Sequence, residues 1–123
     1  RASGLQRKSR VAAEKALGLV GLPNVADCYP AQLSIGEVRR VELARAMISS
    51  PPILLLDELT ANLDDDTIWD TMHLLNELNS RGTTIIMATH ASQFVNYMRR
   101  RVITLVDGKL FGDVKNGKYG DVV

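Results

Sequence analysis

The sequence lacks three features that would indicate particular classes of protein: paired cysteines, a long apolar run and an excess of charge of one sign. Its single cysteine, Cys28, cannot form an internal disulfide, so we expect a cytoplasmic setting and an inert thiol. No apolar stretch approaches the roughly 20 residues that a transmembrane helix needs. The net charge of +1 gives no bulk attraction to nucleic acid, which we therefore do not expect as a partner. We also find no internal repeat, which argues against a solenoid.

What remains is an ordinary composition for one modest globular domain. The chain has 123 residues, of which 46% are apolar and 24% charged. It begins at Arg1 in mid-pattern, without Met or a signal peptide, and we expect that an N-terminal part of a longer protein is missing. The first ten residues are polar and basic. We expect them to form a solvated face, with a role against phosphates or lipid as the open alternative.

An apolar run over residues 53–56 ends in two carboxylates, Asp57 and Glu58. Four consecutive large aliphatic residues predict a strand that is buried on both faces, as in a parallel sheet covered by helices. Ligands bind beyond the carboxyl ends of the strands in such sheets, which is where the two carboxylates stand. The alternative is that Asp57 only begins a turn.

Periodicity places the other elements around this strand. It predicts helices over 11–20, 36–49, 65–80 and 92–98, strands over 83–88 and 102–106, and a return strand over 109–114 after an Asp107-Gly108 turn. The expected buried faces are Val38, Val41, Ala44 and Ile48 in the second helix and Ile68, Met72, Leu75 and Leu78 in the third. We expect His73 and residues 99–101 at the surface, with a membrane-surface role for the latter as an alternative. The order predicts an α/β fold, with a mainly parallel sheet flanked by helices and a C-terminal β-hairpin.

The start of the second helix, Ser34-Ile35-Gly36-Glu37, has two compatible interpretations. Ser34 with Glu37 three residues later is a capping box, in which each side chain satisfies a free backbone N–H. A helix start with a glycine also exposes N–H donors and a positive dipole to a phosphate. The neighbouring motifs must decide between them.

Those neighbours are the strand ending at Asp57-Glu58, then Asn62-Leu63-Asp64, and a second strand followed by His90. In this order and spacing the chain resembles the C-terminal half of the ATP-binding domain of ABC transporters, a branch of the P-loop NTPases. The resemblance makes residues 33–37 the signature motif, 53–58 the Walker B strand, 61–64 the D-loop and His90 the switch histidine. It assigns residues 1–50 to the helical subdomain with the signature motif and 51–123 to the C-terminal part of the ATPase core.

The resemblance narrows to the cell-division ATPases of this family, which act with a permease-like membrane partner. It rests on residues 20–22, 29–30, 81–84, 87–90, 101–103, 107–108 and 117–120. It implies a protein at the inner face of the cell membrane. Another ABC transporter subunit is the alternative.

The resemblance also implies roles for individual residues. Two ATP-binding subunits would enclose two ATP molecules, each held between the phosphate loop of one subunit and the signature helix of the other. Asp57 would hold Mg²⁺ through water, Glu58 would act as general base, and His90 would orient the attacking water against the γ-phosphate. Ser34, Gly36 and Glu37 would contact the γ-phosphate side of ATP on the partner subunit, and Asp64 would couple the two sites.

The chain departs from the family at three points. The family usually has Gly where Ile35 stands and Pro where Leu59 stands, and Ile35 would be strained if the loop needed a positive φ there. The phosphate loop G-x-x-x-x-G-K-[ST] is missing. The near-match over residues 112–119 ends in Tyr119, which is too large to place a hydroxyl on Mg²⁺, and only four residues follow it. We expect a turn there, and no ATP turnover by this chain alone.

Two further hypotheses remain. Ile35 favours a degenerate half-domain that docks on a partner without turnover, whereas Asp57, Glu58 and His90 argue against it. A lobe of an SMC-like chromosome ATPase would follow a long coiled coil, and residues 1–22 show no sustained heptads.

Overall fold

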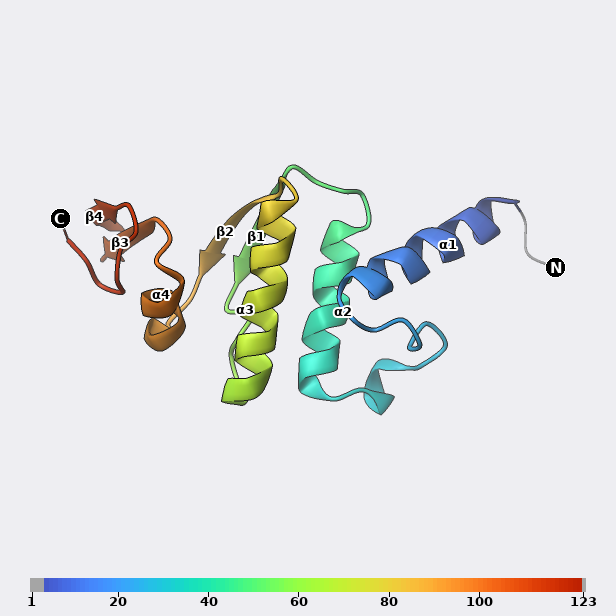
Figure 1. Cartoon of the computed structure of the whole chain (residues 1–123). Helices are drawn as coiled ribbons and strands as arrows, with labels where there is room; N and C mark the ends of the chain where they lie inside the picture. The colour runs from blue at the N-terminus through green and yellow to red at the C-terminus, as the bar shows by residue number, and fades with distance from the viewer. Residues whose placement is uncertain (1–3, 123) are drawn as a thin grey trace. The chain divides into compact units, whose positions relative to one another are not determined.

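A computed structural model describes residues 4–122, so Arg1 lies outside the described part. In chain order, its elements are α1 (Gly4–Leu19), the 3₁₀ helix η1 (Pro30–Gln32), α2 (Ile35–Met47), β1 (Ile53–Asp57), α3 (Asp65–Ser80), β2 (Thr84–Ala88), α4 (Ser92–Met98), β3 (Val102–Val106) and β4 (Lys109–Val114) (Figure 1). The predicted order and types are confirmed. Some details differ: η1 was not predicted, α1 begins at Gly4 rather than at residue 11, α2 covers Ile35–Met47 rather than 36–49, and β2 begins at Thr84 rather than at residue 83. Residues 4–10 are mostly polar, and glutamine, arginine and lysine favour a helix without giving an apolar pattern of helical spacing. Periodicity therefore missed the first turns of α1.

The chain divides into two compact units, Arg1–Ala88 and Thr89–Val123, and each is described by itself. The subdomain boundary expected at residue 50 is a different division and stays a prediction. None of the described helices is both long and apolar enough to cross a membrane.

The first unit contains a parallel pair of strands connected through α3. The register runs from Ile53 opposite Thr84 to Asp57 opposite Ala88. The N–H of Glu58 donates to the carbonyl of Ala88 at 2.9 Å, which continues the pairing one residue past β1. The predicted stripe of α3 is confirmed, since all four of its residues are buried, namely Ile68, Met72, Leu75 and Leu78. This βαβ arrangement brings the carboxyl ends of both strands to one edge.

The prediction that β1 is buried on both faces is wrong. Leu54 is 3% exposed, but its neighbours Ile53 and Leu55 are 54% and 72% exposed. Successive side chains of a strand point to opposite faces, and Ile86 in β2, 58% exposed, shares the face of Leu55 through the parallel register. In the described part of the chain, one face of this sheet is therefore covered and the other is open.

The predicted buried face of α2 is also wrong. Of the four residues only Ala44 is buried, while Val38 and Val41 are half-buried and Ile48 is 48% exposed. The buried residues of the observed stripe are Leu43, Ala44 and Met47, and the half-buried Gly36 and Arg40 precede them on the side that faces α3. Periodicity missed it because Gly36 and Arg40 do not count as apolar, although both face α3.

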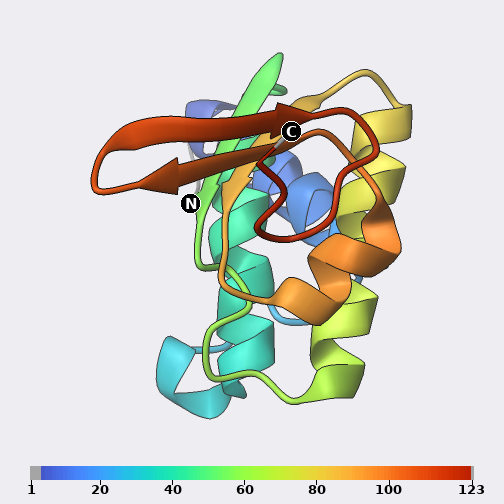
Figure 2. The ribbon, with the colours of Figure 1, turned by 90° about the vertical axis from the view of Figure 1, so that its left-hand side faces the viewer.

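The second unit consists of α4, the hairpin of β3 and β4, and the tail after Val114. Asp107 and Gly108 have φ of +50° and +75°, as a two-residue type I′ turn requires. Figure 2 shows the two strands running antiparallel from this tight turn. The register shifts between Thr104 and Leu105, which leaves Phe111 as the extra residue of a β-bulge. The predicted hairpin is therefore confirmed, but its β-bulge was not predicted.

Candidate functional site

The segment before α2 forms the capping box that the sequence predicted. The N–H of Glu37 donates to Oγ of Ser34 at 3.1 Å, and the N–H of Ser34 donates to Oε1 of Glu37 at 2.9 Å. Ile35 is the first residue of the helix, is 59% exposed, and does not have a positive φ. The conditional strain at Ile35 therefore does not arise, because a β-branched residue fits a helical first turn.

This segment lines one pocket together with the segment before α3. The pocket has a volume of about 390 Å³ and is lined by Leu22, residues 34–37, Arg40, residues 62–64, Thr67 and Asp70. Four predicted site residues are thus brought together, namely Ser34, Gly36, Glu37 and Asp64. Asp64 is the N-cap residue of α3, yet its side chain makes no capping hydrogen bond. Sequence reasoning missed Arg40, Thr67 and Asp70, although the four-residue step from Gly36 to Arg40 could have placed Arg40 on this face.

The carboxyl end of β1 carries the next two candidates. Asp57 is exposed at the last position of the strand. Glu58 follows with a φ of +51°, which is uncommon for a residue other than glycine and is found disproportionately at functional sites. Leu59 and Thr60, 6% and 5% exposed, anchor the turn that follows. Leu59 therefore acts as a core residue where the family usually has proline.

A metal ion would find only part of its coordination here. The region spanning residues 4–122 has no group of three or more His, Cys, Asp or Glu side chains placed to hold one. Mg²⁺ commonly uses one or two carboxylates together with water and phosphate oxygens. A single exposed carboxylate such as Asp57 fits that donor set as one ligand, with phosphates required for the rest.

His90 belongs to the second unit, so its approach to Glu58 stays a prediction. Within that unit, His90 Nδ1 lies 3.3 Å from the hydroxyl of Tyr119. The backbone N–H of Tyr119 donates to Oδ1 of Asn96 at 2.7 Å, which fixes the tail beside α4. Sequence reasoning missed the contact of Tyr119 with His90. It considered Tyr119 only as the residue that does not fit the last position of the phosphate-loop pattern. The first three residues of that near-match belong to β4, and the predicted turn begins only after Val114.

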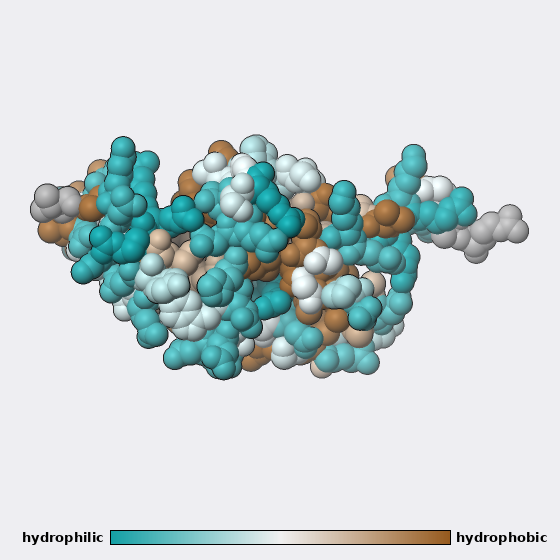
Figure 3. Space-filling model, in the orientation of Figure 1, coloured by the Kyte–Doolittle hydropathy of each residue, from teal (hydrophilic) through white to brown (hydrophobic). Residues whose placement is uncertain are grey.

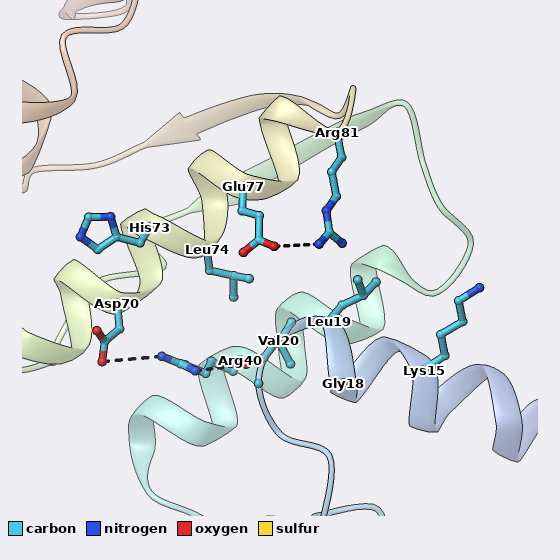
Figure 4. Close-up of a pocket in the computed structure, with 11 residues that line it drawn as sticks. Lys15, Gly18, Leu19, Val20, Arg40, Asp70, His73, Leu74, Glu77 and Arg81 are labelled. Carbon is cyan, nitrogen blue, oxygen red and sulfur yellow. Dashed lines mark hydrogen bonds and ion pairs between the residues drawn. The ribbon is translucent and has the colours of Figure 1, made fainter.

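A second hollow in the first unit has a volume of about 770 Å³ (Figure 4). Two ion pairs border it: Arg40 Nη2 lies 3.9 Å from Oδ2 of Asp70, and Arg81 Nη2 lies 2.7 Å from Oε1 of Glu77. Arg40 Nη1 also donates to the carbonyl of Val20 at 3.1 Å. Figure 3 shows hydrophobic residues reaching the surface over α2 and α3, among hydrophilic ones. His73 lines this hollow and is exposed, as expected.

Comparisons with known proteins agree with these motifs. The profile of the family described as ABC transporter matches residues 2–61. The cell division ATP-binding protein FtsE of Bacillus subtilis is 47% identical over 104 residues, which are 85% of this chain and 46% of that protein. The chain is thus similar to the ATP-binding domains of the ABC transporter family. FtsE of Escherichia coli is 44% identical over 113 residues, covering 92% of this chain and 50% of that protein.

Solved ABC structures give the same result for the fold. A dimeric ATP-binding cassette in a post-hydrolysis state, bound to ADP and Pi, is 34% identical with a TM-score of 0.74, over 97% of this chain and 51% of that one. An ATP-binding cassette in an ADP conformation is 23% identical with a TM-score of 0.80, over 85% of this chain and 41% of that one. The predicted α/β fold of the P-loop NTPase type is confirmed. The chain spans about half the length of the ABC relatives it matches.

Proposed function

We propose that this chain supplies the signature, Walker B, D-loop and switch-histidine part of an ATP-hydrolysing subunit that acts in cell division. The observation that carries the proposal is the meeting of Ser34, Gly36, Glu37 and Asp64 around one pocket. In the first unit, these residues lie in the same compact body as the strand that ends at Asp57 and Glu58. The identity of 44–47% to FtsE proteins supports the cell-division assignment.

Each residue has one task in this proposal. Asp57 would hold Mg²⁺ through water, and the ion would neutralise charge on the phosphates. Glu58, whose backbone is in the left-handed region, accepts a proton from the attacking water. His90 donates a hydrogen bond to the γ-phosphate and orients that water. Phosphoryl transfer depends on such positioning more than on covalent chemistry.

The pocket residues act on a second subunit. Ser34, Gly36 and Glu37 contact the γ-phosphate side of ATP that is bound to the partner subunit, and Asp64 couples the two sites. The 34%-identical cassette bound to ADP and Pi is a dimer, which supports a homodimer in the ATP state. We further propose a membrane partner resembling FtsX and a position at the cytoplasmic face of the membrane, on the basis of the FtsE relatives.

The nucleotide needs one more element than this sequence contains. The pattern G-x-x-x-x-G-K-[ST] is absent, and its near-match is strand and turn rather than the start of a helix. We therefore propose that the phosphates are held by a phosphate loop outside this sequence and that the 123-residue chain alone does not turn over ATP.

Substitution of the general base tests the proposal. In the protein that contains this chain together with a phosphate loop, Glu58→Gln keeps ATP binding and lowers the hydrolysis rate about 10²–10⁴-fold, because an amide cannot accept the proton. Phosphate release measures turnover and a fluorescent ATP analogue measures binding. Glu77→Gln is the matched control, since Glu77 is an exposed carboxylate paired with Arg81. Near-normal turnover in Glu58→Gln would remove Glu58 from the role of base.

A further inference from the structure

We propose that Thr67 is a positioning residue that packs against Gly36. Together with Arg40, it holds the signature segment and the D-loop in a fixed relative position. The signature segment is residues 33–37 and the D-loop is residues 61–64. The inference rests on the proposed function, but it concerns contacts between α2 and α3 that need no nucleotide.

The first contact lies where the two helices begin. Gly36 is the second residue of α2, and its φ is not positive. A Cβ added to Gly36 would lie 2.8 Å from Cγ2 of Thr67, closer than real Cβ atoms come to a neighbour. Thr67 is the third residue of α3, directly after the D-loop. The lack of a side chain at Gly36 therefore leaves the space that the methyl group of Thr67 occupies, whatever ligand binds nearby.

Glycine is costly at this position unless something offsets it. Glycine is less favourable than alanine in a helix, because it loses more backbone freedom on folding. Gly18 in α1 is the contrast, since a Cβ there would have nothing within 4 Å. A side chain at Gly18 would therefore point into open space, whereas one at Gly36 would meet Thr67 of α3.

The second contact lies one turn further along both helices. Arg40 is four residues after Gly36, and Asp70 is three residues after Thr67. Arg40 Nη2 lies 3.9 Å from Oδ2 of Asp70, and its Nη1 donates to the carbonyl of Val20 at 3.1 Å. Figure 4 shows Arg40 and Asp70 facing each other from α2 and α3. The two contacts lie one turn apart, and both join α2 to α3.

This arrangement has a consequence for the reaction. Ser34 and Glu37 flank Gly36, and Asp64 lies three residues before Thr67. When the first turns of both helices are held together, the groups that face the partner subunit's nucleotide keep a fixed geometry with the D-loop. Small misplacements of positioning groups cost large factors in rate. Thr67 acts through Gly36 and Asp64 and does not touch the nucleotide.

A rescue experiment tests the inference in the protein that contains this chain and a phosphate loop. We expect Gly36→Ala to lower kcat at least tenfold, because the new methyl group separates the two helices. Thr67→Ala removes Cγ2 and leaves the Cβ of residue 67 at 3.9 Å from the added atom. The double variant should therefore recover to the kcat of Thr67→Ala alone. A double variant as slow as Gly36→Ala would show that Gly36 acts only through its approach to the nucleotide, which overturns the inference.

A second readout uses the 123-residue chain and needs no nucleotide. We expect Gly36→Ala to lower the midpoint of urea unfolding and Thr67→Ala to restore it in the double variant. Gly18→Ala is the matched control and should not lower the midpoint, because the added methyl group meets open space. An unchanged midpoint in Gly36→Ala would overturn the packing. Absence of turnover in the unsubstituted full-length protein would instead overturn the proposed function, so the two failures are distinguishable.

Discussion

The two units of the chain are stabilised in different ways. Among the described residues, twelve of the thirteen buried apolar side chains lie in the first unit, and only Phe94 lies in the second. The second unit exposes most apolar residues of its hairpin, with Leu105 and Leu110 at 66% and 64%. Burial of apolar surface is the main favourable term in folding. The first unit therefore has a core, and the second depends on other interactions.

Those other interactions are turns and hydrogen bonds. Thr104 Oγ1 donates to the carbonyl of Asp121 at 2.8 Å, and the N–H of Lys118 donates to Oδ2 of Asp121 at 2.6 Å. A Cβ on Gly112 would collide with the backbone of Asp121, so the tail crosses the hairpin at a glycine. Segments with few buried apolar contacts open locally at lower free energy than a core does. His90 lies in this second unit, while Glu58 lies in the first.

Leucine truncations in the two units should give the largest difference. Leu75→Ala removes a side chain that is 4% exposed and should cost about 2–5 kcal/mol of the free energy of unfolding. Leu110→Ala, the same change at a 64% exposed position of the hairpin, should cost less than about 1 kcal/mol. Urea unfolding of the chain measures both. Equal costs would show that the hairpin carries a core of its own.

A glycine in the hairpin turn should have a smaller and more local effect. Gly108 has a φ of +75°, and a Cβ there would meet open space, so the cost of Gly108→Ala is conformational. A left-handed alanine costs about 1–2 kcal/mol. Hydrogen exchange should accelerate at the amides of β3 and β4 and stay unchanged in β1 and β2. Faster exchange in both sheets would show that the effect of the substitution is not confined to the hairpin.

The sequence predicted the helices and strands better than it predicted which of their side chains are buried. Helix α3 was predicted with its bounds and its buried stripe, because an apolar pattern with helical spacing is a local property. The burial of Leu55 was predicted wrongly, because it depends on a second layer that the strand itself does not encode. The stripe of α2 was missed because it contains Gly36 and Arg40, whose roles follow from α3 and from the carbonyl of Val20.

In the candidate site, too, local features were predicted from the sequence and tertiary contacts were not. The capping box of Ser34 and Glu37 is local, and its residue types and spacing predicted it. The pocket that joins this segment to Asp64 is tertiary, and no spacing along the chain indicates it. The contact of His90 with Tyr119 joins residues 29 positions apart and was likewise beyond the sequence pattern.

The smallest predicted effect concerns pH and an ion pair in each unit. The guanidinium of Arg101 donates to both carboxylate oxygens of Asp113, at 2.7 and 2.6 Å, and lowers the pKa of Asp113. In the first unit, Arg10 likewise lowers the pKa of Asp27. A lowered folded-state pKa means that each pair stabilises its unit above the unfolded pKa of about 3.9. That stabilisation is lost as the pH falls through the folded pKa.

Because the second unit has little core, loss of its pair should matter more there. Between neutral pH and the acid limit, the hydrogen-exchange protection factors of β3 and β4, which correct for the intrinsic pH dependence of exchange, should fall more in the unsubstituted chain than in Asp113→Asn, which has already lost the titrating carboxylate. The matched variant Asp27→Asn should leave the exchange of α3 amides unchanged over the same range. Both pairs are exposed, so about 1 M salt, with a Debye length of about 3 Å, should reduce the difference. Equal pH dependence in Asp113→Asn and the unsubstituted chain would show that the turn and the tail, rather than the ion pair, hold the hairpin.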